Sequence, residues 1–212
     1  MLKVVIIIIF NFYSLIIFSQ QDNFIGGILF NVNGIQIEGN DTFWPNSNGS
    51  ITGGVGLSTG LSVQHYLLKR YYFNFEIRYI QKGSVFAFLD QSATTYSEIL
   101  RLNYMELPVS LGYQLKIKNK KYFIETGFAY AKLFSSKGNI NEFVNRFGTI
   151  NSENFNDYDI SWFSSLKYPI NKKNKGNLLL GLRFSYSLFT IHRDYKLKNM
   201  VYGLQMDYKF NN

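Results

Sequence analysis

The chain has 212 residues, and its 22 Lys and Arg against 14 Asp and Glu give a formal net charge of +8. It has no cysteine, which excludes disulfides, thiol catalysis and zinc–thiolate sites, and its two histidines offer little for an imidazole metal site. Twenty Phe, 16 Tyr and two Trp with only three Pro indicate an ordered, all-β chain. The cations are scattered or sit in short turn-like clusters, so we expect no nucleic-acid partner.

The chain begins with a candidate export signal. Lys3 precedes an apolar stretch at residues 4–18, which is shorter than the roughly 20 residues of a membrane-spanning helix. A basic start, an apolar centre and the small residue Ser19 are typical of a secretory signal peptide. We therefore expect residues 1–19 to be a signal peptide and residues 20–212 to form one exported domain, with an uncleaved N-terminal anchor as the alternative.

From residue 24 onward, apolar and polar side chains alternate with the period of two that is typical of β-strands. In the clearest segment, Leu178, Leu180 and Leu182 share one face, while Gly181 and Arg183 share the other. Eight such strands are expected, at residues 24–38, 51–67, 71–82, 99–117, 121–135, 157–169, 177–190 and 199–210. The connections alternate between short turns and longer loops, as they do in bacterial outer-membrane barrels with short periplasmic turns.

Two folds explain strands that have one apolar face. In a secreted lipocalin-like carrier this face lines an inner cavity, whereas in a membrane barrel it faces lipid. Here the opposite face carries Gly, Ala and Ser, which suit a narrow interior, and tyrosines at strand ends, such as Tyr71 and Tyr79, match two interfacial girdles. The sequence therefore predicts an all-β, eight-stranded antiparallel up-and-down transmembrane β-barrel in the bacterial outer membrane, with the soluble carrier as the alternative.

Two segments break the alternation. In the fourth segment the apolar side chains change parity, so we expect a β-bulge at residues 105–108, where Pro108 cannot donate to a ladder. This bulge would turn both Arg101 and Glu106 toward the lumen. A weaker change around Gly34 in the first segment predicts a bulge there or an exit from the bilayer.

The predicted inner face carries charged residues. An isolated buried ion costs several kcal/mol, so charges in a narrow barrel must pair. We interpret them as a structural network of ion pairs, with a narrow selective pore as the alternative, and expect three of the four acids to lie within reach of Arg78 or Arg183. The predicted lumen residues are Glu76, Arg78, Glu106, Glu125, Arg183 and Asp207.

The chain carries no recognisable catalytic motif. His192 and Asp194 lie in the last long connection, but no motif places a nucleophile or a second acid beside them, so we interpret this segment as a solvated loop. Walker, nucleophile-elbow, zinc-protease and EF-hand patterns do not occur. We therefore expect no catalytic residue, cofactor or metal, and no enzymatic activity.

The connections offer two candidate contacts. Residues 139–156 are rich in Asn and contain three Phe, including Phe155, so this exterior loop is a candidate contact for a protein partner, with a mobile surface loop as the default. The basic turns at residues 118–121 and 171–175 are interpreted as solvated hairpin ends, with contact to lipid headgroups of the inner leaflet as the alternative.

Four stretches resemble a known family in their order and spacing. They are Tyr79–Gly83, Leu102–Pro108, Phe123–Gly127 and Gly181–Ser187, and the second, which reads L-N-Y-M-E-L-P, is the most specific. Over nearly its whole mature length, the chain resembles the PorT-like outer-membrane β-barrel family of Bacteroidetes. The resemblance implies an eight-stranded outer-membrane barrel with a structural, envelope or interaction role and no assigned activity. One founding member takes part in type IX secretion, whereas most members are not known to, so the resemblance offers a link to secretion as one alternative.

Overall fold

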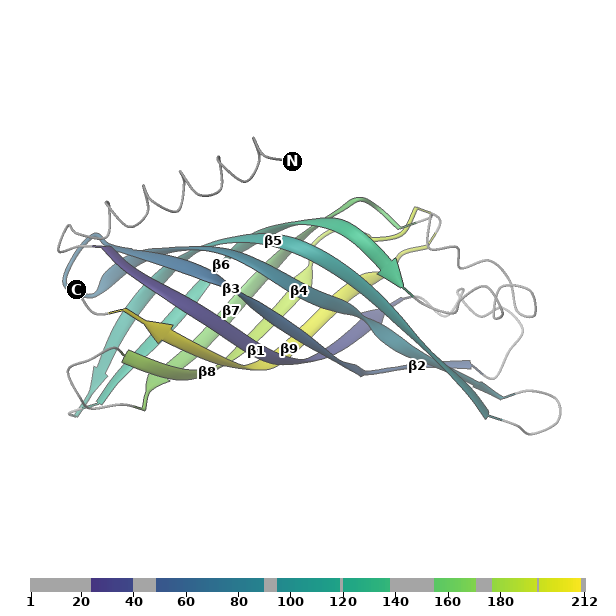
Figure 1. Cartoon of the computed structure of the whole chain (residues 1–212), viewed down its shortest axis with the longest axis horizontal. Helices are drawn as coiled ribbons and strands as arrows, with labels where there is room; N and C mark the ends of the chain where they lie inside the picture. Colours follow the sequence, from purple (N-terminus) through teal and green to yellow (C-terminus); the bar gives the residue numbers. More distant parts are fainter. Residues whose placement is uncertain are drawn as a thin grey trace, which may run out of the picture.

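The computed structural model describes residues 24–39, 49–89, 95–118, 120–137, 155–170, 177–193 and 195–210. These residues form one antiparallel sheet that closes on itself into a barrel (Figure 1). Its strands are β1 (Phe24–Glu38), β2 (Gly49–Thr52), β3 (Gly54–Tyr66), β4 (Tyr71–Leu89), β5 (Thr95–Ile117), β6 (Lys120–Lys137), β7 (Tyr158–Pro169), β8 (Asn177–Ser187) and β9 (Lys198–Lys209). The short β2 and β3 both pair with β4, so the two occupy one place in the wall of an eight-stranded barrel. No described residues form a helix that is both long and apolar enough to cross a membrane.

The strands run obliquely around the barrel (Figure 1). Register partners followed once around the wall from Tyr71 on β4 return to β4 at Gln81, ten residues further along (81 − 71 = 10). The path runs through Tyr113, Ile124, Leu166, Leu182, Leu204, Val32 and Leu57, from which the β3–β4 register continues to Gln81. Such a stagger goes with a strand tilt of about 35–45°, and eight strands enclose an interior that side chains can fill.

The outer face of the barrel is apolar. Leu182 and Leu204 point outward and are 60% and 58% exposed. At the short-turn end, Tyr71 packs against Tyr113 with ring centroids 4.9 Å apart, and the far end of the same strand carries Tyr79. Eight residues of tilted strand span about 20 Å, close to the apolar band of an outer-membrane barrel. The apolar faces of the strands therefore point outward, which excludes the lipocalin-like alternative.

The bulge expected at residues 105–108 is absent, so this prediction is wrong, and of the two forms expected at Gly34 the bulge is absent too. From Leu100 to Gly112, every even-numbered residue of β5 is buried inside the barrel, and β1 keeps a constant register with both of its neighbours. Glu106 therefore points inward, as expected, but Arg101 is exposed on the outer side. The register shift of this region lies between Asn103 and Tyr104, where β5 pairs with β6.

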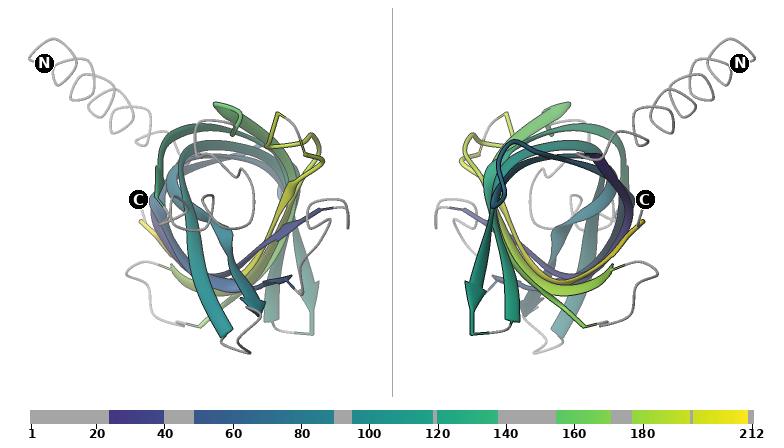
Figure 2. Two further views of the ribbon diagram at one scale, coloured as in Figure 1. Left: turned by 90° about the vertical axis from the view of Figure 1, so that its right-hand side faces the viewer. Right: turned by 90° about the vertical axis from the view of Figure 1, so that its left-hand side faces the viewer.

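The change of parity in the sequence has a different cause, which is an apolar cluster inside the long-loop end of the barrel. We call this group the mouth cluster. Its members come from five strands and from the segments before β7 and between β8 and β9. They are Ile35, Ile37, Ile80, Phe86, Leu100, Leu102, Tyr104, Ala131, Phe155, Ile191, Leu197 and Val201. Figure 2 shows the barrel from its two ends. The side chains of the mouth cluster pack together inside the long-loop end.

Two predicted loops take other forms. Residues 83–98 are largely a hairpin, because β4 continues to Leu89 and β5 starts at Thr95, so this hairpin extends beyond the rest of the wall (Figure 1). The strand expected at residues 51–67 is interrupted at Gly53. Most of the loop at residues 139–156 lies outside the described residues, as do the predicted signal peptide and the whole of the predicted turn at residues 171–175.

The charged barrel interior as the candidate functional site

Ten charged side chains are buried inside the barrel, five cationic and five anionic. The structure places all six predicted lumen residues there, with exposed fractions between 0% and 5%. Sequence reasoning missed four others, Lys82, Asp159, Lys167 and Lys209. The last three share the inward parity of their strands, so the alternation that found the six could have found them too. Lys82 was overlooked because it lies at the end of the expected strand.

The first group of ion pairs lies next to the mouth cluster, on β4, β5 and β7. Lys82 Nζ lies 2.9 Å from Asp159 Oδ2 and 2.9 Å from Glu106 Oε1, so one ammonium forms ion pairs with two carboxylates. Arg78 forms an ion pair with Glu106 and donates from Nε to Glu106 Oε2 at 2.6 Å. Asp159 Oδ2 also accepts hydrogen bonds from Ser187 and Asn199 at 3.0 and 3.1 Å. This group therefore connects the three strands β4, β5 and β7 across the interior of the barrel.

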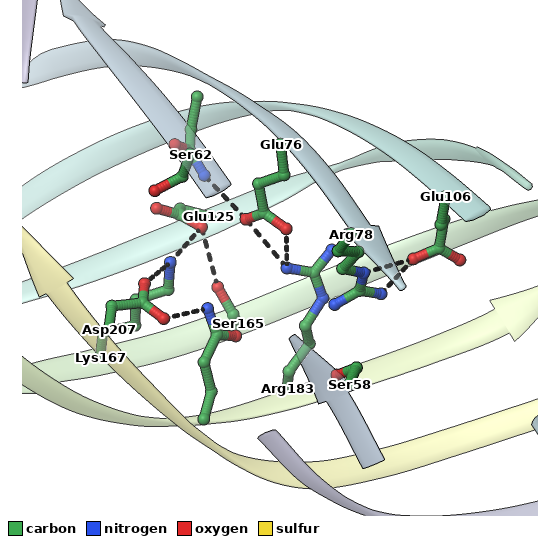
Figure 3. A network of polar contacts seen from close by, with 12 residues as sticks. Ser58, Ser62, Glu76, Arg78, Glu106, Glu125, Ser165, Lys167, Arg183 and Asp207 are labelled. Carbon is green, nitrogen blue, oxygen red and sulfur yellow. Dashed lines mark hydrogen bonds and ion pairs between the residues drawn. The ribbon is translucent and has the colours of Figure 1, made fainter. Parts of the chain in front are cut away.

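The second group spans the barrel from β8 to β4 (Figure 3). Arg183 Nη1 donates to both oxygens of Glu76, at 2.8 and 3.1 Å, and Asn74 donates to Glu76 at 2.9 Å. The Arg183 guanidinium also lies over the Phe163 ring, 3.8 Å from its centroid. Because β4 and β8 stand on opposite sides of the closed sheet, this pair fills the width of the lumen.

The third group lies nearer the short-turn end and is centred on Lys167. Its Nζ is 2.8 Å from Glu125 Oε2 and 2.8 Å from Asp207 Oδ2. Glu125 also accepts hydrogen bonds from the Tyr72 hydroxyl at 3.0 Å and from Ser165 at 3.2 Å. Tyr72 lies flat against the wall at Gly112, where a Cβ atom would collide with the Tyr72 ring. The glycine thus makes room for a bulky residue in the narrow interior.

The pairing differs from the expectation that three of the four predicted acids would meet Arg78 or Arg183. Only Glu76 and Glu106 form ion pairs with arginine, whereas Glu125 and Asp207 share Lys167. Parity tells which face a residue occupies, but its height in the lumen depends on the tilt of the strands. That tilt brings β6, β7 and β9 residues to one level.

His192 is buried, with 1% of its surface exposed, so the prediction of a solvated loop at this residue is wrong. Its backbone forms an isolated bridge with Phe155, and its Nδ1 accepts a hydrogen bond from the Tyr195 amide at 3.2 Å. Phe155 is 2% exposed and belongs to the mouth cluster, so this phenylalanine is not free to contact a partner. Among the residues that the structure describes, no three His, Asp or Glu side chains are grouped so that they could hold a metal ion.

The sequence matches a family model over residues 18–193, and that model describes the outer membrane protein beta-barrel domain. The chain belongs to this family. An apolar outer band around a polar interior is typical of outer-membrane barrels. The chain is therefore an integral β-barrel protein of the bacterial outer membrane.

Several solved structures of outer-membrane proteins are similar to this barrel. OprG from Pseudomonas aeruginosa is 10% identical with a TM-score of 0.47, and the match covers 89% of this chain and 95% of OprG. Neisserial surface protein A is 10% identical with a TM-score of 0.49, and the match covers 87% of this chain and 97% of that protein. Ail, the attachment invasion locus protein of Yersinia pestis, is 11% identical with a TM-score of 0.45, over 90% of this chain and all of Ail (100%). No curated protein matches the sequence.

Proposed function

We propose that this barrel is a closed, non-conducting and non-enzymatic envelope protein, and that its long-loop end contacts a protein partner outside the cell. The observation that carries the proposal is the filled interior. The mouth cluster occupies the long-loop end, and beneath it five cations and five anions occupy the lumen. Paired charges that span the lumen leave no continuous aqueous path for an ion, since an ion in transit would have to break them.

The long-loop end is the better candidate for partner contact because the wall extends furthest there. The β4–β5 hairpin reaches beyond the outer tyrosines and exposes Ser97, Ile99 and Arg101. Rigid strands that present a few exposed side chains form a more defined surface than a loop does. The exposed Ile99, at 47%, lies above the lipid band by its register with Val85 and offers an apolar contact.

Electrical recording tests the closed state. The purified chain in a planar bilayer is expected to give no stable conductance steps, because the interior is plugged. As a positive control, the variant Arg183→Ala, Glu76→Ala, Leu102→Ala and Tyr104→Ala removes bulk from both the charged lumen and the mouth cluster while leaving the outer face unchanged. Discrete, reproducible open steps from the unmodified chain would overturn the proposal and favour the narrow-pore alternative.

We further propose that the chain is a PorT-like barrel made with a cleaved signal peptide at residues 1–19. The stretch Leu102–Pro108 supports the family proposal as the most specific part of the sequence resemblance. A deletion strain tests the link to secretion, and the expected result is loss of secreted cargo with unchanged envelope permeability. Normal secretion would reject that link, and N-terminal sequencing of the mature protein tests the cleavage.

A further inference from the structure

The short-turn end of the barrel carries a group of exposed cations, which we call the basic collar. They lie in the turn between β3 and β4 and in the hairpin between β5 and β6. The collar consists of Lys69, Arg70, Lys116, Lys118, Lys120 and Lys121, and all six are exposed. The described residues of this end include no exposed Asp or Glu. The sequence between β7 and β8 adds three further lysines at residues 171–175 and no acid.

Two of these cations are anchored to the aromatic girdle at this end. Arg70 Nη1 donates to the Tyr113 hydroxyl at 3.4 Å, and Lys120 Nζ lies over the Tyr168 ring, 5.6 Å from its centroid. Tyr168 in turn packs near Tyr122, with ring centroids 5.3 Å apart. Tyrosines of a membrane protein mark the level of the lipid headgroups. The charged ends of Arg70 and Lys120 are therefore held at headgroup level.

The opposite end of the barrel has a mixed charge. Its exposed described residues include the cations Arg101, Lys132 and Arg193, but also the acids Glu38 and Asp157. Among the residues that the structure describes, exposed cations without exposed acids are therefore found at the short-turn end and not at the opposite end. Phosphate-bearing anionic lipids are attracted to such a surface, by an amount that adds up over the lysines and arginines near it.

We propose that the basic collar binds anionic phospholipid headgroups of the leaflet that borders the short turns. In an outer-membrane barrel, this is the periplasmic leaflet. The collar would surround the barrel with a ring of anionic lipid, and it would fix the depth of the protein by charge as well as by the apolar band. The proposal is independent of whether the lumen conducts, since it rests only on surface residues.

Lipid competition in vesicles tests the proposal. The full-length purified barrel is reconstituted in phosphatidylcholine vesicles that contain a trace of fluorescent phosphatidylglycerol or fluorescent phosphatidylcholine, and energy transfer from the protein's tryptophans measures enrichment around the wall. We expect enrichment of phosphatidylglycerol over phosphatidylcholine that falls when the salt concentration rises from 0.1 to about 0.5 M, because salt screens surface charges.

The test variant is the triple Lys118→Gln, Lys120→Gln and Lys121→Gln, and the control is the triple Arg101→Gln, Lys132→Gln and Arg193→Gln at the opposite end. Loss of three cations is expected to lower the phosphatidylglycerol preference at least about fivefold, while the control keeps it. Equal preference for both lipids in the unmodified chain, or equal loss in both triple variants, would overturn the proposal. If the test variant fails to fold, the salt dependence of the unmodified chain still decides, because a salt-independent preference also overturns it.

Discussion

Removal of Lys167 tests the idea that the lumen charges hold the barrel together. The substitution Lys167→Met keeps most of the side-chain volume but deletes the ammonium that lies 2.8 Å from both Glu125 and Asp207. Both carboxylates are buried, with exposed fractions of 0% and 1%. Breaking a buried pair by removing one partner costs about 3–5 kcal/mol, because it leaves an uncompensated charge.

Two acids lose their partner, but we do not expect the cost to double. Glu125 keeps its hydrogen bonds from Tyr72 and Ser165, and Asp207 keeps one from Gln205 at 2.7 Å. The ammonium of Lys209 also acts on both carboxylates through space. The expected loss in the free energy of unfolding is therefore about 3–5 kcal/mol in total.

The assay is urea unfolding of the barrel in lipid vesicles, followed by tryptophan fluorescence and by the gel shift of the folded form. The matched control is Lys132→Met, which removes an exposed lysine from the outer face of β6 and should change stability by no more than about 0.5 kcal/mol. The loss in the free energy of unfolding caused by Lys167→Met should become smaller as the pH falls, because protonation removes the unpaired carboxylate charges. The triple variant Lys167→Met, Glu125→Gln and Asp207→Asn should recover most of the loss, since it contains no unpaired charge.

Equal stability of Lys167→Met and the Lys132→Met control at neutral pH would refute the reasoning. The lumen charges would then be solvated by water that enters from the short-turn end, and the ion pairs would contribute little. A deficit that the triple variant does not recover would instead mean that the lysine stem, not its charge, supports the barrel.

Three further outcomes follow from the geometry. Leu182→Arg places a charge on the lipid face and should oppose insertion by about 2–4 kcal/mol, measured as folding yield into bilayers. Tyr72→Phe removes the 3.0 Å hydrogen bond to Glu125 and should lower the free energy of unfolding by about 1.5–3 kcal/mol in urea titration. A cysteine at Ser97 should react with an impermeant maleimide on intact cells, whereas one at Lys118 should be protected; the reverse pattern would invert the topology.

The sequence was sufficient for the wall of the barrel but not for the contents of its long-loop end. Alternation located the strands because one face of each strand meets lipid where the strand crosses the apolar band, and it placed Glu76 and Arg183 inside. The same rule failed at Leu100 and Leu102, because it assumes a polar interior and the mouth cluster is apolar. An apolar residue that points inward then looks like a strand that has changed face.

The alternation of side chains could not predict which lumen charges form ion pairs, and the reason is geometric. A pair such as Lys82 with Asp159 joins residues 77 positions apart in the chain, on strands that are not neighbours in the sheet. Whether two inward residues meet depends on the stagger accumulated around the barrel, which no single strand reveals. Burial of His192 was missed for a similar reason, since its bridge partner Phe155 precedes a different strand.

The long sequence separations within the lumen bear on how the barrel assembles. Glu76 and Arg183 are 107 residues apart, and Lys209, on the last strand, donates to Ser62 across 147 residues. A partly formed sheet therefore carries charges whose partners lie on strands that have not yet paired. These unpaired charges keep the face that will line the lumen hydrated. Only when β9 joins β1 do the two halves of the network meet. Pairing of β9 with β1 and neutralisation of the interior charges are thus one event. An incomplete barrel is therefore unstable in the membrane, which favours all-or-none folding.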